Sequence, residues 1–138
     1  MSTSSHALEP RLADYLRTLS LRCEDPLLAE LRAVTAELPQ AEMQISVEQG
    51  LFMELLVRSL GARRCLEVGV FTGYSALAVA LALQEMHGAS AHLLACDISE
   101  EWTIKARAYW REAGLGDVVD LCVAPAAETL DARLAAGE

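Results

Sequence analysis

Residues 64–75 read Arg64-Cys65-Leu66-Glu67-Val68-Gly69-Val70-Phe71-Thr72-Gly73-Tyr74-Ser75. The apolar run 65–68 has the length of a buried strand, and a loop with two glycines follows it. The Ala- and Leu-rich run 75–83 then predicts a buried helix. A strand, a glycine loop and a helix form the first β-α unit of nucleotide-binding folds, where glycine lets the backbone turn sharply and lie against a ligand.

The glycine loop lacks the signatures of two common nucleotide sites. A dinucleotide site needs G-x-G-x-x-G, but Phe71 stands where the second glycine belongs. A phosphate-binding Walker loop needs Gly-Lys-Ser/Thr, but no lysine follows Gly73. Glu67, at the carboxyl end of the strand, would repel a pyrophosphate and would suit a ligand with a positive centre and no phosphate. S-adenosylmethionine (SAM), which carries an ammonium and a sulfonium, is such a ligand.

An acidic residue follows the second predicted strand. This strand covers 93–96, and Asp97 comes directly after it. Asp97 lies roughly 20 residues beyond the glycine loop, near the spacing at which an acidic side chain accepts hydrogen bonds from ribose hydroxyls. Glu67, Gly69, Gly73 and Asp97 together indicate a nucleoside-containing ligand more specifically than any one of them.

The segment from Glu67 to Ser75 resembles motif I of the class I SAM-dependent O-methyltransferases, in the branch of caffeoyl-CoA and catechol O-methyltransferases. Residues 43–50 are similar to that branch's segment before the first core helix, and residues 124–130 to its segment after the third strand. The resemblance runs from about residue 10 to the last residue. It implies a Rossmann-like α/β fold and methyl transfer from SAM to a hydroxyl of a small catechol-like or caffeoyl-type acceptor.

The resemblance also implies which residues bind SAM. They are Ile45, Glu67, Gly69, Val70, Gly73, Ser75, Asp97 and Ala126. In the family, the backbone at Ile45 holds the methionine moiety, and Ala126 contacts adenine through its backbone. Ser75 lies at the helix start, where free N–H groups and a hydroxyl could receive the SAM carboxylate. Trp102 either stacks on adenine or packs in the core.

The complete family member is expected to use a divalent, Mg²⁺-like metal that holds two vicinal oxygens of the acceptor and lowers the pKa of the attacking hydroxyl. The resemblance places its ligands beyond Glu138, so we predict no metal ligand here, and no catalytic residue is identified. The chain is expected to be the SAM-binding half, inactive alone, in a homodimer or completed by a second chain. A non-catalytic SAM-binding or interaction fragment is the alternative, and a dinucleotide-binding domain is less favoured.

The order of the predicted elements indicates one half of a doubly wound α/β sheet. Helices are predicted at 8–21, 27–38, 46–60, 75–83, 99–114 and 128–136, and strands at 65–68, 93–96 and 118–123. Right-handed crossovers give strand order 3-2-1, with strand 65–68 at an open edge. We divide the chain into a tail with two helices (1–45) and the N-terminal half of a SAM-binding domain (46–138). The first two helices are interpreted as a layer on the sheet, with a lid or a dimer face as the alternative.

Composition limits the classes of partner. Eleven basic and twenty acidic residues give a net charge of −9, which opposes binding to nucleic acid or an anionic membrane. The sequence has no run of apolar residues long enough to predict a transmembrane helix. The polar start, 1–6, is interpreted as a frayed tail of a cytoplasmic protein. Cysteines without C-x-x-C spacing predict buried thiols in a reducing compartment: Cys23, Cys65, Cys96 and Cys122.

Overall fold

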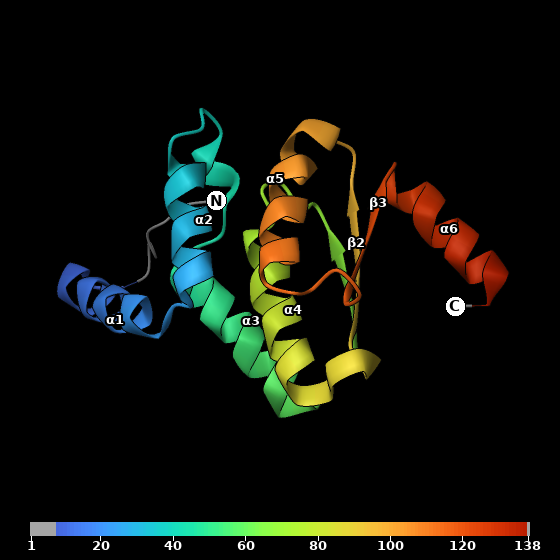
Figure 1. Ribbon diagram of the computed structural model, residues 1–138. Coiled ribbons are helices and arrows are strands. Elements are labelled where there is room, and N and C mark those ends of the chain that lie inside the picture. Colours follow the sequence, from blue (N-terminus) through green and yellow to red (C-terminus); the bar gives the residue numbers. More distant parts are fainter. Residues whose placement is uncertain (1–7, 138) are drawn as a thin grey trace.

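The computed structural model describes residues 8–137, so the predicted tail at 1–6 lies outside the described residues. Helices precede an alternation of strands and helices (Figure 1). The elements are α1 (Pro10–Cys23), α2 (Pro26–Ala36), η1 (Ala41–Met43), α3 (Val47–Leu60), β1 (Arg64–Val68), α4 (Tyr74–His87), η2 (Gly88–Ser90), β2 (His92–Asp97), α5 (Glu100–Glu112), β3 (Val119–Val123) and α6 (Ala126–Ala136).

The strands form a parallel sheet in the order β1-β2-β3, which confirms the predicted strand order. The register pairs Leu66 of β1 with Leu94 of β2, and Leu94 with Asp120 of β3. Within the described chain β1 pairs only with β2, so its outer side is unpaired, as predicted. Leu66 and Val68 are 52% and 61% exposed. This edge therefore presents apolar side chains and free backbone groups to solvent.

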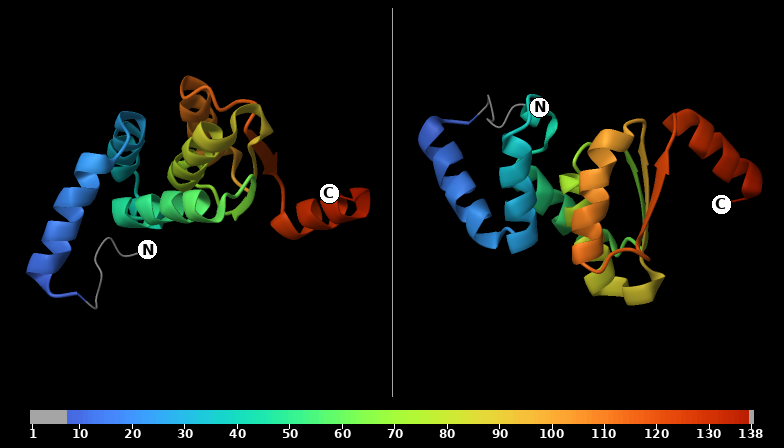
Figure 2. Two further views of the ribbon diagram at one scale, coloured as in Figure 1. Left: turned by 90° about the horizontal axis from the view of Figure 1, so that it is seen from below. Right: turned by 45° about the horizontal axis from the view of Figure 1, so that its top comes forward.

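The sheet lies between two unequal layers of helices. Helices α4 and α5 cover one face, and α6 alone lies on the other (Figures 1 and 2). Helix α4 is the centre of the core because its small and branched residues are fully buried, among them Ala76, Leu77 and Leu83. The predicted buried helix is confirmed, and it continues to His87 because nothing interrupts it before Gly88, which has φ 52°.

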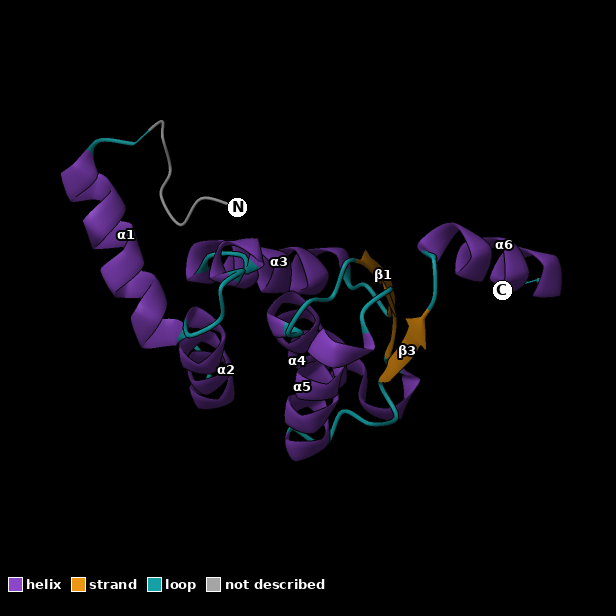
Figure 3. Ribbon diagram, turned by 90° about the horizontal axis from the view of Figure 1, so that it is seen from above, coloured by secondary structure: helices purple, strands orange, loops and turns teal. Residues whose placement is uncertain are grey.

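The first two helices do not form a layer on the sheet, so that interpretation is wrong. Helix α2 packs against α4, and α1 packs against α3 on the side remote from the sheet (Figure 3). The reason is that α4 and α5 already cover this face, so α2 packs on the outer side of α4, beside the glycine loop and α5. Helix α2 also buries Thr35 together with Leu28 and Leu31, whereas the neighbouring Val34 is 39% exposed. It ends at Ala36, before the predicted end at Leu38.

The residues at four helix ends, three Asp or Ser side chains and one glycine, are of types that typically cap helices, and the structure shows them in that role. Asp25 Oδ1 accepts a hydrogen bond from Leu27 N–H at 2.8 Å, and Ser46 Oγ accepts one from Gln49 N–H at 3.2 Å. Ser99 Oγ accepts from Trp102 N–H at 3.4 Å, and Gly61 follows α3 with φ 62°. These side chains satisfy N–H groups that have no partner inside the helix, which fixes where α2, α3 and α5 begin.

The segment before α3 begins with the short helix η1, which ends at Met43, and the chain becomes extended at Gln44. The four cysteines are free, and the prediction of buried thiols holds fully at Cys96 only. Cys65 and Cys122 are half-buried, and Cys23 is exposed at the end of α1, where the prediction is wrong. It is wrong because α1 buries none of its residues. Within residues 8–137, the structure contains no helix with the length and apolar character needed to cross a membrane.

Candidate functional site

The carboxyl ends of the three parallel strands meet at one edge of the sheet, and most of the predicted site residues lie there. Glu67 lies next to the last residue of β1, Asp97 ends β2, and Ala126 begins α6 after β3. The loops that follow are tied to the neighbouring strands. Gly69 N–H donates to the Cys96 carbonyl, and Ala124 N–H donates to the Asp97 carbonyl, each at 2.9 Å. This is where open parallel sheets bind their ligands.

A cavity of about 240 Å³ opens beside the glycine loop. It lies between this loop, the start of α4 and the segment that leads into α3. Its lining includes five of the predicted residues, Ile45, Glu67, Gly69, Val70 and Ser75. The other three predicted residues are Gly73, Asp97 and Ala126, which do not line it. The structure therefore brings together residues from two segments that are separate in the sequence.

Two residues that line the cavity each have a buried oxygen to which no group in the described chain donates a hydrogen bond. Glu67 Oε1 accepts a 2.6 Å hydrogen bond from Ser75 Oγ, but Glu67 Oε2 is buried without a partner among the described residues. Gln44 lines the same cavity, and its Oε1 is also buried without a partner in that part of the chain. Buried acceptors left unsatisfied cost free energy, so a ligand that donates hydrogen bonds fits here. We did not predict Gln44; its only sequence signal is a polar residue just before Ile45.

The carboxyl group of Glu67 is hard to ionise because it is buried. Burial raises its pKa to about 7, and the nearby charge of Asp97 acts in the same direction. The hydrogen bond from Ser75 opposes both effects. Perturbed carboxyl groups of this kind mark functional sites. A cationic group bound at Oε2 would favour the ionised form, so ligand charge and Glu67 ionisation are coupled.

The two glycines of the loop have different roles. Gly69 has φ 90°, and a methyl group added there would meet no atom within 4 Å, so its open side faces the space that a ligand can use. Gly73 has φ 91°, but a methyl group there would lie 2.5 Å from Ala106 Cβ of α5. We expected Gly73 to lie against the ligand. Its lack of a side chain lets α5 pack against the loop.

Phe71 is the strained residue of the loop. Its φ is 53°, a left-handed conformation that non-glycine residues rarely adopt and that surrounding contacts must maintain. Its ring packs edge-on against Trp102, with ring centroids 5.0 Å apart and planes at 82°. Of the two interpretations left open for Trp102, packing is therefore the one that these contacts support.

Asp97 organises the loop from the end of β2. Its Oδ2 accepts hydrogen bonds from the N–H groups of Val70 at 2.7 Å and Phe71 at 2.9 Å. Its Oδ1 accepts one from Ser99 N–H at 2.8 Å. Burial alone would raise the pKa of Asp97, but these backbone bonds outweigh it and the pKa is lowered. Asp97 is therefore ionised at neutral pH, and Oδ1 retains capacity to accept a further hydrogen bond.

The first backbone N–H groups of α4 lie beside the same region. The first intrahelical bond after the loop runs from Leu77 N–H to the Gly73 carbonyl at 2.9 Å. The N–H groups of the three residues before Leu77 precede this bond, and with the helix dipole they favour an anion such as a carboxylate. The Ser75 hydroxyl, also expected to meet the ligand, donates to Glu67 in this structure.

The residues present do not form a metal site. Among residues 8–137, no group of three or more His, Cys, Asp or Glu side chains is arranged to hold a metal ion. The described part of the chain therefore does not supply a ligand set for the divalent metal expected in the complete family member.

Comparison with known sequences gives a consistent set of matches. A family described as O-methyltransferase matches residues 18–137. Catechol O-methyltransferase domain-containing protein 1 of Mus musculus is 40% identical over 127 residues, which cover 92% of this chain and 47% of that protein. Caffeoyl-CoA O-methyltransferase 2 of Zea mays is 36% identical over 121 residues, which cover 87% of this chain and 44% of that protein. The chain therefore spans about half the length of these curated relatives.

Solved structures give similar matches. A Podospora anserina methyltransferase with bound S-adenosylhomocysteine (SAH) matches with a TM-score of 0.76 and 27% identity, covering 92% of this chain and 55% of that chain. The O-methyltransferase TomG of Streptomyces achromogenes, solved with SAM, matches with a TM-score of 0.67 and 30% identity. That match covers 79% of this chain and 47% of the other.

Proposed function

Because this chain belongs to the O-methyltransferase family, as its resemblance predicted, we propose that it binds SAM in the cavity beside the glycine loop. It would supply the donor half of a methyl transfer to a hydroxyl group. One observation carries this proposal: Glu67 and Gln44 both line that cavity, and each has a buried oxygen, Oε2 and Oε1, that finds no partner among the described residues. The ammonium group of SAM is a donor that both acceptors can share, and its charge matches Glu67.

The methionine moiety of SAM would lie between two segments. The backbone at Ile45 contacts one side of it, and the N–H groups at the start of α4, including that of Ser75, receive its carboxylate. The open side of Gly69 lets the backbone of Gly69 and Val70 approach the cofactor. The structure supports this arrangement because the residues named here line one cavity.

The nucleoside would lie toward the ends of β2 and β3. Asp97 Oδ1 has acceptor capacity left for a ribose hydroxyl, and its lowered pKa keeps it charged. The backbone at Ala126 would contact adenine. Gly73 remains a site residue in this proposal, since it permits the loop to pack between α5 and the cofactor.

When bound, SAM supplies a methyl group activated by its sulfonium. The residues of this chain hold and orient that donor, and positioning is a large part of the catalysis of such a transfer. For the whole protein we propose a small acceptor with vicinal hydroxyls, of the catechol or caffeoyl type, because relatives named for these acceptors match. The proposed assembly is a homodimer or a complex with a second chain, and the proposed location is cytoplasmic.

A second candidate function is SAM binding without turnover. It is favoured by the lack of a metal-ligand cluster in residues 8–137. A dinucleotide-binding domain is disfavoured, because Glu67 stands beside the loop where a pyrophosphate would lie and Phe71 replaces the second glycine.

Isothermal titration calorimetry tests the proposal with SAM, SAH and NAD as ligands. We expect binding of SAM and SAH and none of NAD. Glu67→Gln should abolish or strongly weaken binding, because it removes the charge but retains an acceptor for Ser75. The matched control is Glu101→Gln, at an exposed carboxylate in the first turn of α5, which should bind as the parent does. NAD binding tighter than SAM would contradict the proposal.

A further inference from the structure

Two sets of polar contacts join α2 and the residue pair before it to the glycine loop, although these segments are far apart in the sequence. One set links Thr35 to Thr72, and the other links Glu24 and Arg32 to Tyr74. Neither set was expected from the sequence. We call the three residues Glu24, Arg32 and Thr35 the α2 clasp.

The first contact is a buried pair of hydroxyls. Thr35 Oγ1 and Thr72 Oγ1 lie 2.8 Å apart, and both residues are 0% exposed. Thr72 stands between the strained Phe71 and Gly73, in the middle of the loop. Loss of one hydroxyl would leave the other buried without its partner, which is unfavourable. The pair therefore fixes the last turn of α2 against the loop.

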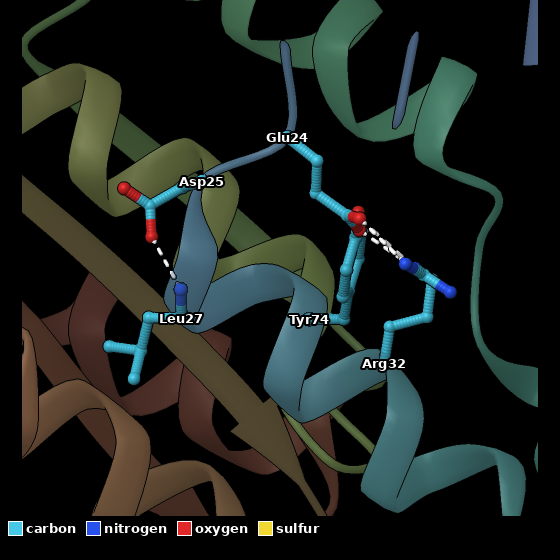
Figure 4. Close-up of polar contacts among 5 residues, drawn as sticks. All are labelled: Glu24, Asp25, Leu27, Arg32 and Tyr74. Carbon is cyan, nitrogen blue, oxygen red and sulfur yellow. Dashed lines mark hydrogen bonds and ion pairs between the residues drawn. The ribbon is translucent and has the colours of Figure 1, made fainter. Parts of the chain in front are cut away.

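The second contact is a buried carboxylate with two donors from different elements (Figure 4). Glu24, whose side chain is 2% exposed, accepts hydrogen bonds from Arg32 Nε at 2.8 Å and Arg32 Nη2 at 2.8 Å. Its Oε1 also accepts the Tyr74 hydroxyl at 2.7 Å. Burial opposes ionisation, but the bonds from Arg32 and Tyr74 outweigh it and lower the pKa of Glu24. Two-point contact with arginine fixes direction as well as distance.

The Tyr74 ring is held in place from a further side. A methyl group added at Gly50 of α3 would lie 3.1 Å from Tyr74 Cε1, so α3 passes close to the ring. Tyr74 is the first residue of α4, directly after the loop, and it is 3% exposed. Fixing its hydroxyl through Glu24 therefore fixes the point at which the loop becomes a helix.

The opposite side of the loop is held by α5 and β2. Trp110 Nε1 donates to the Gly73 carbonyl at 3.4 Å, and Asp97 accepts from Val70 and Phe71. The left-handed Phe71 lies between these supports and the α2 clasp. A strained loop conformation persists only where the surrounding contacts over-determine it. Supports on one side alone would let the loop relax away from the cavity.

We propose that the α2 clasp holds the glycine loop in its cofactor-binding conformation, so that Glu24, Arg32 and Thr35 are positioning residues for SAM. This inference rests on the proposed function. It gives the N-terminal helices a role in cofactor affinity, because Glu24 directly follows the last residue of α1.

The decisive variants are at Thr35. Thr35→Val keeps the shape and removes the hydroxyl, whereas Thr35→Ser keeps the hydroxyl. The matched control is Thr103→Val in α5: Thr103 is also 0% exposed, and its hydroxyl donates to the carbonyls of Ser99 and Glu100 in its own helix. Two quantities are measured for each variant of the 138-residue chain, the SAH dissociation constant by calorimetry and amide hydrogen exchange of residues 69–75 by mass spectrometry.

We expect Thr35→Val to weaken SAH binding at least about fivefold and to accelerate exchange in the loop. Thr35→Ser and Thr103→Val should stay within about twofold of the parent in affinity. The inference is overturned if Thr35→Val leaves either the SAH affinity or the loop exchange unchanged. It is also overturned if Thr103→Val changes both quantities as much as Thr35→Val does. If the parent chain does not bind SAH, the proposed function fails, and loop exchange alone then decides whether the clasp holds the loop.

A second pair of variants tests the other contact. Glu24→Gln keeps the size of the side chain and removes the charge that pairs with Arg32. Glu85→Gln is the control, because it breaks the exposed Arg58–Glu85 pair at a distance from the loop. Glu24→Gln should weaken SAH binding and speed loop exchange, and Glu85→Gln should do neither. Equal effects of the two substitutions would overturn the assignment, and this pair carries the test if Thr35→Val does not fold.

Discussion

The carboxylate of Glu67 and the hydroxyl of Ser75 are joined by a 2.6 Å hydrogen bond across the glycine loop. This bond occupies one carboxylate oxygen and leaves the other buried without a partner in the described chain. A cation bound beside this carboxyl group would therefore favour the loss of its proton. Two predictions, on affinity and on stability, follow from that linkage.

Cofactor affinity should fall in mild acid. Burial is the main reason that the pKa of Glu67 is raised to about 7. Below that pH the carboxyl group must lose a proton before it can hold the ammonium of SAH, and above it the group is already charged. We expect SAH to bind about tenfold more weakly at pH 6 than at pH 8. Calorimetry across this range measures the effect. A profile that is flat in the parent chain would show that the ligand does not meet Glu67.

Glu67 should also reduce the stability of the ligand-free chain at neutral pH. Between about pH 4.5 and 7 the folded state holds a proton at Glu67 that the unfolded state has released, so stability falls as pH rises. We therefore expect Glu67→Gln to raise the free energy of unfolding above pH 7, by up to roughly 3 kcal/mol, with little effect at pH 4.5. Urea unfolding at both pH values measures the difference. Equal effects at the two pH values would contradict this ionisation argument.

Replacing Gly73 should destabilise the fold by more than the strain of its backbone angle alone. Gly73→Ala places a methyl group 2.5 Å from Ala106 Cβ in addition to the left-handed backbone strain. We expect a loss of about 2–5 kcal/mol, the sum of overpacking and strain. Gly61→Ala is the control, because Gly61 has φ 62° but open space around it, and it should cost about 1 kcal/mol. Similar losses in thermal unfolding would show that α5 yields to the methyl group.

Asp97 should matter for both the loop and the cofactor. Asp97→Ala removes three acceptor contacts, to Val70, Phe71 and Ser99. We expect SAM affinity to fall at least about tenfold, which corresponds to about 1.4 kcal/mol, and the chain to lose stability as well. Asp131→Ala, at an exposed position of α6, is the control. Calorimetry and urea unfolding separate the two effects, and unchanged SAM affinity would remove Asp97 from the site.

Local signals in the sequence were sufficient for much of the fold. The caps at Asp25, Ser46 and Ser99 and the stop at Gly61 depend on neighbouring residues only, so they could be predicted. The strand order followed from the handedness of the crossovers. The position of α2 could not be predicted, because it depends on which face of the sheet α4 and α5 had already covered.

The candidate site shows the same division between local and tertiary information. Glu67 and Gly69 were expected in it because they belong to one contiguous motif, and both line the cavity. The contact between Thr35 and Thr72 spans 37 positions and depends on tertiary packing, so no sequence pattern pointed to it. The buried Thr35 also interrupts the apolar pattern of α2, although the neighbouring apolar Val34 is 39% exposed.

The exposed edge of β1 should make this chain associate. Leu66 and Val68 are 52% and 61% exposed, and the outer backbone groups of the strand have no partner within the described chain. Such an edge is a template for pairing with another strand, and burying its apolar surface gains about 25 cal/mol per Å².

We expect sedimentation velocity to show association that rises with concentration. Leu66→Lys should reduce it by placing a charge on the edge. Ile104→Lys is the control, because Ile104 is 58% exposed on α5, away from this edge. A chain that stays monomeric across the concentration range would show that the edge is protected in solution, and equal effects of the two lysines would place the association surface elsewhere.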